Sequence, residues 1–143
     1  MKIQFSIHEY DISDGMIDGL SVAAKIKRKP ESVFKTLVTV GKTTGLNVFV
    51  IPVGCGLDLK KAALAAGDKY IEMIKSRDLE PLTGYIHGGC SPIGMKKAFP
   101  TFIEETALLL DTMVVSAGRI GLQAEIAPMD LAQVIAAVFR DIV

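Results

Sequence analysis

The chain has 143 residues, of which 50% are hydrophobic and 22% are charged. This length and composition predict one compact domain with its own hydrophobic core, and they exclude a disordered protein. The 16 basic and 16 acidic residues cancel. The chain as a whole is therefore not a general binder of polyanions, and any contact with RNA must come from a local patch.

The first predicted elements alternate between strand and helix. Residues 3–8 alternate apolar and polar side chains, which is typical of a half-buried strand and unlike the apolar core of a signal peptide. A helical pattern follows within residues 14–29 and stops before a proline. Two apolar strands, 33–40 and 46–53, come next, and the polar residues 41–45 join them.

The middle of the chain has weaker signals. A helix is predicted over residues 59–66, because Asp58 can cap its first turn and Gly67 can end its last turn. Residues 69–73 fit either a short strand or the start of a helix. Residues 76–82 read as a weak helical turn that a proline interrupts.

The last part of the chain returns to clear patterns. Residues 101–110 are ambiguous, but 112–116 and 122–126 read as strands on either side of a glycine-containing link. An amphipathic helix is predicted over residues 129–139. No stretch approaches the roughly 20 apolar residues of a membrane span. We therefore expect a soluble, cytoplasmic α/β domain that extends over residues 1–143.

Lys35 lies within the apolar strand predicted at residues 33–40. Alternation places it on one face with Val33 and Leu37, and both faces of the strand are mostly apolar, which indicates a central strand. An ammonium on an apolar wall needs a partner or a function. Either its stem packs while the charge reaches water or a carboxylate, or Lys35 is the fixed cation of a pocket.

A glycine-rich loop at residues 84–97 reads GYIHGGCSPIGMKK. Its adjacent glycines lack the Cβ that would keep another group at a distance. The loop fails as a phosphate loop because Met95 stands where a lysine is required. It fails as a hydrolase elbow because Pro92 has no N–H to give an oxyanion. A plain tight turn and a loop whose backbone donors hold a carbonyl oxygen or a ribose both remain open.

The residues that most often supply nucleophiles or metal ligands are sparse. Cys55 and Cys90 lack the spacing of a redox or zinc motif, and with only two histidines in the chain we expect no metal site and no cofactor. Both thiols should be reduced. Neither cysteine nor Ser91 has a recognisable base, so none of the three is expected to act as the nucleophile.

The sequence resembles the YbaK family, the free-standing aminoacyl-tRNA editing proteins related to the insertion domain of bacterial prolyl-tRNA synthetases. The similarity rests first on VFKTL (33–37) and on the glycine loop (84–97). It extends through IHEY (7–10), LDLKKAALAAG (57–67) and SAGRIGLQAEIAP (116–128), and so covers nearly the whole chain. The resemblance implies an α/β fold whose mixed, mostly antiparallel, partly barrel-like sheet is flanked by helices.

The resemblance also implies an activity and a site. The implied reaction removes a mischarged amino acid, typically cysteine, from tRNA, and the cysteinyl thiol attacks its own ester carbonyl. Lys35 matches the central lysine of the family and is the expected catalytic residue. The expected substrate-binding residues match other family positions: Tyr10, Thr36, Gly88, Gly89, Ser91, Pro92, Gly94, Ser116 and Gly118.

Two positions depart from the family pattern. Gln123 stands where an acidic residue is common, and Asp18 stands where an aromatic residue is often found. These departures leave the identity of the removed amino acid open. The leading substrate is Cys-tRNA(Pro), with Cys-tRNA(Cys) beside it. The alternatives are hydrolysis of Ala-tRNA(Pro) and non-catalytic binding of a nucleotide or amino acid.

The expected partners are the acceptor end of a mischarged tRNA and, by the resemblance, prolyl-tRNA synthetase. Small basic clusters could hold RNA phosphates, and Lys96–Lys97 is the most suggestive because it adjoins the glycine loop. A charge run is more commonly a solvated face.

Overall fold

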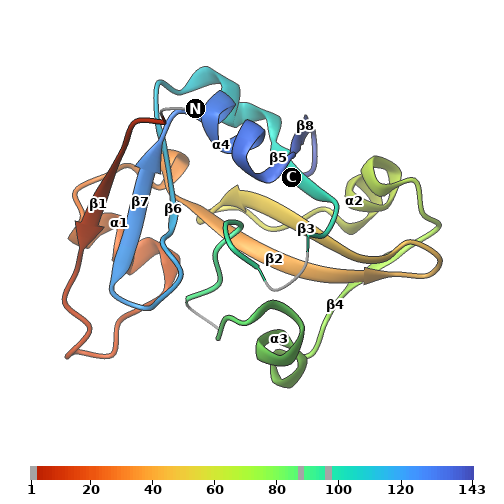
Figure 1. Ribbon diagram of the computed structural model, residues 1–143, viewed down its shortest axis with the longest axis horizontal. Coiled ribbons are helices and arrows are strands. Elements are labelled where there is room, and N and C mark those ends of the chain that lie inside the picture. The colour runs from red at the N-terminus through yellow and green to blue at the C-terminus, as the bar shows by residue number, and fades with distance from the viewer. Residues whose placement is uncertain (1–2, 87–88, 96–97) are drawn as a thin grey trace.

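The computed structural model describes residues 3–86, 89–95 and 98–143, which fold into two β-sheets with flanking helices (Figure 1). The smaller sheet is antiparallel and has the strand order β1–β7–β6. Its strands are β1 (Phe5–Glu9), β6 (Met113–Ser116) and β7 (Leu122–Ile126). Pairing of β1 with β7 joins the two ends of the chain, because Phe5 lies opposite Ile126.

The larger sheet has five strands in the order β4–β2–β3–β5–β8. The pairs β4–β2 and β2–β3 are antiparallel, whereas β3–β5 and β5–β8 are parallel. The strands are β2 (Phe34–Gly41), β3 (Gly45–Pro52), β4 (Ile71–Met73), β5 (Thr101–Glu104) and β8 (Val138–Arg140). The mixed, mostly antiparallel α/β architecture predicted from the sequence is thus confirmed.

The expected barrel-like closure is not confirmed. The described strands form two open sheets, and an isolated parallel bridge between Val33 and Val114 links them just before β2 begins. Each sheet ends on strands that are paired on one side only.

Four α-helices are described, and local capping explains where two of them begin. They are α1 (Gly19–Lys25), α2 (Leu59–Ala66), α3 (Ser76–Thr83) and α4 (Pro128–Ile135). The Asp18 carboxylate accepts a hydrogen bond from the Ser21 N–H and caps α1. Asp58 caps α2 in the same way, and Gly67, with a φ of 71°, ends it as predicted.

The predicted helix over residues 129–139 is wrong in its second half. Ala136 adopts the left-handed conformation with a φ of 52°, which ends α4 at Ile135. The next residues turn back, and Val138 and Phe139 pair with β5 as strand β8. The ambiguous stretch 101–110 resolves into β5 followed by a 3-10 helix over Glu105–Leu109.

The core lies on both faces of the central strands. The middle of β3, from Val48 to Ile51, is fully buried, which explains its continuous apolar run. The smaller sheet packs β6 against β2, and α4 covers the same cluster through Leu131. Figure 1 shows the described part of the glycine loop between β6 and α3.

Candidate functional site

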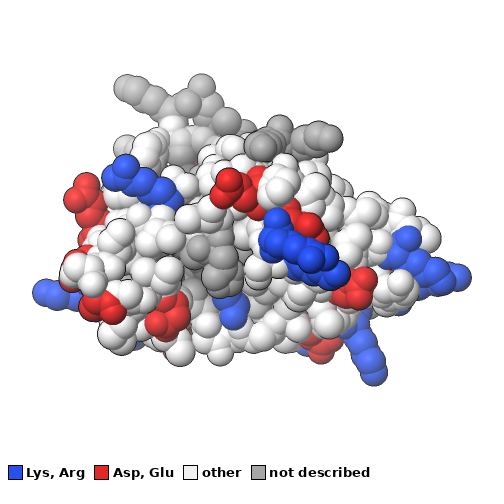
Figure 2. Space-filling model, turned by 90° about the horizontal axis from the view of Figure 1, so that it is seen from below, with Lys and Arg blue, Asp and Glu red and all other residues white. Residues whose placement is uncertain are grey.

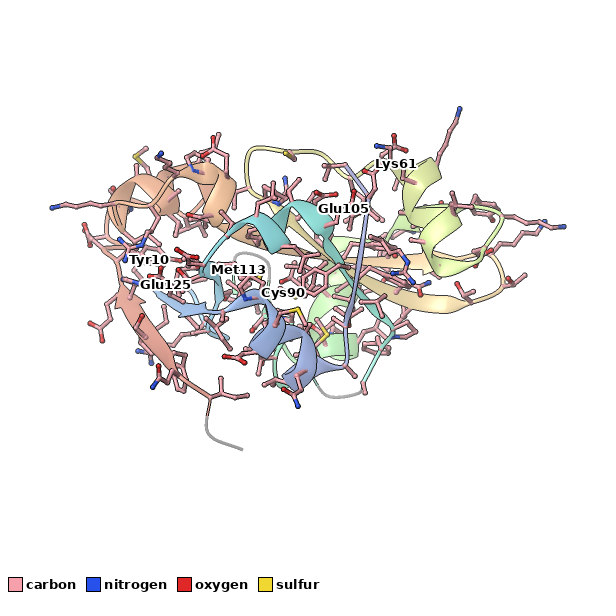
Figure 3. All side chains as sticks on the ribbon, turned by 90° about the horizontal axis from the view of Figure 1, so that it is seen from above. Tyr10, Lys61, Cys90, Glu105, Met113 and Glu125 are labelled. Carbon is pink, nitrogen blue, oxygen red and sulfur yellow. The ribbon has the colours of Figure 1, made fainter. Side chains whose placement is uncertain are left out.

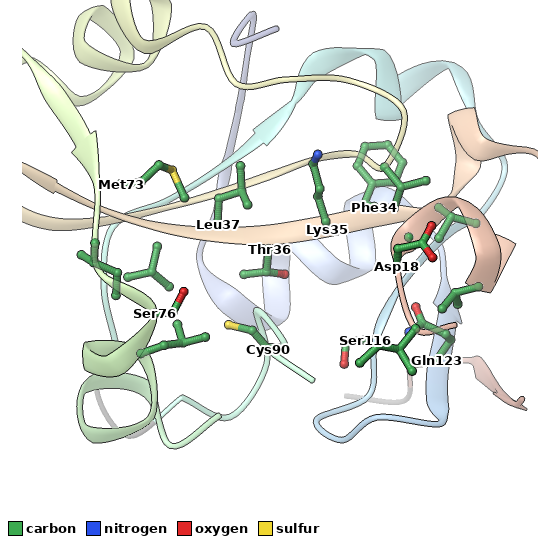
Figure 4. A pocket seen from close by; sticks show the side chains of 18 of the residues that line it. Asp18, Phe34, Lys35, Thr36, Leu37, Met73, Ser76, Cys90, Ser116 and Gln123 are labelled. Atoms are coloured by element: carbon green, nitrogen blue, oxygen red, sulfur yellow. The ribbon is translucent and has the colours of Figure 1, made fainter. Parts of the chain in front are cut away.

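A pocket of about 470 Å³ lies along β2, between the smaller sheet and α3 (Figure 4). Its floor is formed by residues 33–38. Its walls come from the start of α1, the junction of β4 and α3, and the ends of β6 and β7. Cys90 enters it from the glycine loop. A pocket of this size suits a small molecule or the end of a larger one.

The pocket exists because β2 lacks a neighbour along part of one edge. Strand β4 pairs with β2 only at Thr39–Gly41, and the bridge to Val114 occupies Val33 at the other end. Between them, no other described strand pairs with residues 34–38 on that side. The gap in the sheet is the opening of the site.

Four of the residues predicted from the sequence line this pocket: Tyr10, Lys35, Thr36 and Ser116. Lys35 and Thr36 are adjacent and so project from opposite faces of β2, as Figure 4 shows. Both can line one pocket because the pocket extends around the open edge of the strand. Thr36 lies on the side of Cys90 and Ser116 in Figure 4, and Lys35 rises on the other side.

Lys35 is the only cationic side chain among the described lining residues. It is half-buried, and it makes no ion pair with any acidic group of the described chain. The interpretation in which a carboxylate of the described chain neutralises it therefore finds no support. An ammonium without an ion-pair partner among the described residues is available for an anionic or developing negative group.

Two hydroxyl groups in the pocket are buried without a hydrogen-bond partner in the described chain: Tyr10 Oη and Thr36 Oγ1. The ring of Tyr10 is held by Lys25, whose Nζ lies 5.9 Å from the ring centroid. Figure 3 shows Tyr10 beside the smaller sheet and Cys90 nearer the middle of the molecule. Unpartnered buried hydroxyls cost stability, so the pocket is suited to a ligand with polar groups.

The two departures from the family pattern, Asp18 and Gln123, both line the pocket. Asp18 is the only carboxylate there among the described lining residues. The hydrogen bond from the Ser21 hydroxyl holds the pKa of Asp18 below its usual value, so this group stays ionised. Gln123 is buried near the start of β7 and presents a neutral amide. The negative charge of the site thus comes from the cap of α1.

At Gly89, Gly94 and Gly118, other parts of the protein already occupy the space that a side chain would need. A Cβ on Gly89 would lie 3.1 Å from the backbone nitrogen of Ile120. A Cβ on Gly94 would lie 3.0 Å from the hydroxyl oxygen of Tyr85, and a Cβ on Gly118 would lie 3.2 Å from the Tyr85 ring. The Tyr85 hydroxyl donates a hydrogen bond to a carbonyl of the same loop. These glycines allow the loop to dock on the β6–β7 turn through Tyr85.

The remaining loop residues that were predicted to bind substrate do not share one environment. Ser91 is buried, and its Oγ accepts a hydrogen bond from the Ile93 N–H at 3.1 Å, which shapes the turn. Gly88 lies outside the described residues. The pocket lining includes Cys90 but not Gly89, Ser91, Pro92, Gly94 or Gly118.

Cys90 is the pocket residue that most resembles a nucleophile. Burial raises the pKa of its thiol to about 11, because the buried site disfavours the thiolate. The thiol is therefore protonated at neutral pH and unreactive. This supports, for Cys90, the prediction that the protein's own cysteines do not attack the substrate, which stays a prediction.

Sequence reasoning missed several contributors. Met73 and Ser76 line the pocket from the β4–α3 junction, and no pattern in the sequence marks them. Tyr85 could have been noticed as the aromatic residue near the start of the glycine loop. Among the described residues, no three potential metal ligands gather, and none of the helices has the length and apolar character to cross a bilayer.

Residues 19–134 match the aminoacyl-tRNA editing domain family. The chain belongs to this family. A proposed Cys-tRNA(Pro)/Cys-tRNA(Cys) deacylase of Enterococcus faecalis, EbsC, is 49% identical over 127 residues, which are 89% of this chain and 77% of that protein. The family resemblance predicted from the sequence is therefore confirmed.

Solved structures support the same fold for this editing domain. A proposed trans-editing enzyme for prolyl-tRNA synthetase superposes with a TM-score of 0.86 at 22% identity, over 96% of this chain and 85% of that one. A hypothetical protein superposes with a TM-score of 0.84 at 20% identity, over 99% and 91%. At these identities the similarity concerns the fold.

Proposed function

We propose that this editing domain is a trans-acting deacylase that removes cysteine from mischarged tRNA, with Cys-tRNA(Pro) as its leading substrate. The 49% identity to EbsC supports the substrate class. One observation carries the proposed chemistry: the pocket offers hydroxyls and an ammonium, while its thiol, Cys90, is protonated. None of the described lining residues pairs a nucleophile with a base, so we assign the nucleophile to the substrate.

The cysteinyl thiol would be that nucleophile. Its sulfur attacks the ester carbonyl carbon, the bond from that carbon to the ribose oxygen breaks, and the thiol proton passes to the ribose oxygen. The products are a cysteine thiolactone and the free tRNA end. Closing a strained small ring requires the thiol and carbonyl to be held in a near-attack geometry, which is what a tight pocket can supply.

In this mechanism the protein stabilises charge and orients the ester. Lys35 would stabilise the negative charge that develops on the ester oxygens, where it is worth more in the transition state than in the ground state. The unpartnered hydroxyls of Tyr10 and Thr36 would bind the ribose or the aminoacyl group. Ser116 would complete the same wall.

Selection by chemical reactivity also distinguishes amino acids that are too similar in size for the pocket to separate by fit. An apolar pocket separates amino acids that differ by one small group by only about 1–3 kcal/mol. Serine and cysteine have nearly the same shape, but a thiol ionises far more readily than a hydroxyl. Cysteine can therefore be removed where serine, alanine and proline are left.

Delivery of the substrate would need help. The formal net charge is zero, and Figure 2 shows basic and acidic side chains interspersed over the face that it displays. The affinity of the isolated protein for tRNA should therefore be modest and sensitive to salt. We propose that a synthetase, namely prolyl-tRNA synthetase, assists binding in the cytoplasm, where aminoacyl-tRNA is used.

A panel of mischarged tRNAs tests the function. Single-turnover deacylation should be fast for Cys-tRNA(Pro), slower or equal for Cys-tRNA(Cys), and near background for Ser-tRNA(Pro) and Ala-tRNA(Pro). Comparable turnover of the cysteinyl and seryl substrates, with solvent oxygen in the released acid, would instead indicate ordinary hydrolysis. Turnover of none of them would leave a binding protein. Added synthetase should raise the rate at physiological salt.

A further inference from the structure

The hydrogen bonds of β2 show which of its residues direct their main-chain groups toward its open edge. The Val53 N–H donates to the Val33 carbonyl at 2.8 Å, so Val33 directs its carbonyl toward β3. In an antiparallel ladder, successive residues alternate between facing the partner and facing away. The main-chain groups of Thr36 therefore point away from β3. The Ile74 N–H donates to the Val38 carbonyl at 3.3 Å on that far side, which confirms the alternation.

Thr36 thus brings two main-chain groups to the pocket in addition to its side chain. It lies within the stretch that no described strand pairs on this side. Its N–H and C=O face this unpaired side and make no hydrogen bond to another described residue, and its Oγ1, in the pocket lining, is buried without a partner. Unsatisfied backbone groups in a recess are costly unless water or a ligand binds them.

The recess is too short to be an edge that awaits another strand. The start of α1 closes it at one end, and β4 with α3 closes it at the other. An extended peptide that added to β2 here would run into these elements. A single amino acid residue fits the gap, because it needs only one donor and one acceptor on the strand.

We propose that the main chain of Thr36 binds the aminoacyl group of the substrate as if that group were one residue of a neighbouring strand. The Thr36 carbonyl accepts a hydrogen bond from the α-ammonium, and the Thr36 N–H donates to the ester carbonyl oxygen. An α-amino ester in the extended conformation presents both groups on one side, as does each residue of a hydrogen-bonded antiparallel pair. This assignment rests on the proposed function, and it deepens that function by placing the substrate.

Two consequences follow from this placement. The contacts read the α-amino ester and not its side chain, so discrimination among amino acids is left to the side-chain chemistry. The Thr36 N–H also becomes a fixed donor to the carbonyl oxygen that gains negative charge when sulfur attacks. A backbone donor on a paired strand is held in place before the substrate arrives, and this lowers the cost of orienting it.

Hydrogen exchange tests the contact without any mutation. The probe is 3′-(L-cysteinylamino)-3′-deoxyadenosine, whose amide link cannot be cleaved as an ester. At saturation, exchange of the Thr36 amide, followed by NMR, should slow by roughly tenfold or more. The Leu37 amide, which faces β3, is the matched control and should not change. A probe that binds but leaves Thr36 exchange unaltered overturns the proposal, as does failure to bind.

A des-amino probe isolates the ammonium contact. The same nucleoside that carries a 3-mercaptopropanoyl group retains the carbonyl and the thiol but lacks the α-ammonium. It should bind on the order of tenfold more weakly, because one charge-assisted hydrogen bond is lost, while still protecting the Thr36 amide. Equal affinity of the two probes would overturn the role of the Thr36 carbonyl.

A backbone substitution tests the role of the N–H in the reaction. Replacing the residue-36 amide by an ester, through the α-hydroxy analogue of threonine, removes this donor and leaves the side chain. The single-turnover rate should fall on the order of 100-fold with a much smaller change in Kd. Thr36→Val is the control that keeps the N–H and removes only the hydroxyl. A folded ester variant with a rate near that of the wild type would overturn the proposal.

The outcomes separate the two proposals. If the wild-type protein deacylates none of the mischarged tRNAs but the probe protects the Thr36 amide, the proposed function fails and the strand-edge recognition stands. If the wild type is active and both the exchange and the ester variant are unaffected, the recognition fails and the function stands.

Discussion

The two sides of the pocket differ in how they are built. Strand β2 is held by a full ladder to β3, and it supplies most of the floor, including Lys35 and Thr36. The described part of the glycine loop contains no helix or strand and supplies Cys90. Yet the loop carries the more distinctive sequence. The comparison teaches that a distinctive motif, here the glycine loop, can shape one side of a pocket. Polar groups that face the ligand come from β2, a strand with a much less distinctive sequence.

The largest effect should come from the strand. Lys35→Ala is expected to lower the single-turnover rate of Cys-tRNA(Pro) deacylation on the order of 100-fold or more, as when an oxyanion donor is removed. The half-buried side chain contributes little to the core, so the thermal midpoint should change little. Lys35→Arg should also fail, because a planar guanidinium does not replace a compact ammonium in a tight pocket.

Lys42→Ala is the matched control for this test. Lys42 is an exposed lysine on the hairpin between β2 and β3, away from the pocket lining, and its removal should leave the rate unchanged. A Lys35→Ala protein that remains folded and reacts at a near-normal rate would place the essential groups elsewhere.

The next largest effect concerns the protonation state of the Cys90 thiol in the glycine loop. Burial raises the pKa of the Cys90 thiol to about 11, so the thiolate is scarce below that pH and grows roughly tenfold for each pH unit up to it. Alkylation of Cys90 by iodoacetamide at pH 8 should therefore be on the order of 100-fold slower than that of an ordinary thiol. Peptide mass spectrometry across pH 7–10 measures it. Fast alkylation at pH 7 would mean that a group in the pocket activates Cys90.

Much of the fold could be predicted where the cause is local. The helix over residues 59–66 was predicted with its correct bounds because Asp58 and Gly67 mark its ends by capping chemistry. Strand β8 was missed because Val138–Arg140 continues an amphipathic helical pattern and becomes a strand only by pairing with β5. Such pairing depends on tertiary contacts that periodicity does not encode.

The candidate site, like the fold, could be predicted only in part. Lys35 could be predicted because a charge within an apolar run is unusual in any sequence. The open edge of β2 beside Lys35 could not be predicted. It depends on β4 ending at Met73 and on the bridge that joins the smaller sheet to Val33. The glycines were predicted to allow a ligand to approach closely. The structure fills the Cβ positions of Gly94 and Gly118 with Tyr85, and whether their backbone also contacts substrate stays a prediction.

A glycine substitution tests that packing role. Gly118 has a φ of 106°, and an added Cβ would lie 3.2 Å from the Tyr85 ring. Gly121 is the matched control in the same turn, with a φ of 100° and its nearest neighbour at 3.6 Å. Both changes to alanine should cost about 1–3 kcal/mol for backbone strain, and Gly118→Ala should cost about 1 kcal/mol more for the clash.

Denaturant unfolding of both glycine variants measures the difference. If Gly118 acts through packing, the single-turnover rate of the folded variant should stay within about threefold of the wild type. A rate loss far beyond the loss of stability would show that the turn itself contacts the substrate.

The smallest effect should come from removing both thiols. Neither Cys55 nor Cys90 is paired in a disulfide, and in the proposed reaction, where the substrate thiol attacks, the protonated Cys90 thiol would have no catalytic part. The double change Cys55→Ser and Cys90→Ser should therefore retain most of the activity, within about threefold, the loss reflecting the burial of a hydroxyl where a thiol packed. Single-turnover assays measure this, and mass spectrometry of the wild type after reaction should find no acyl group on Cys90. A covalent acyl-enzyme at Cys90, together with an inactive double variant, would contradict the assignment and make the loop, and not the strand, the source of the chemistry.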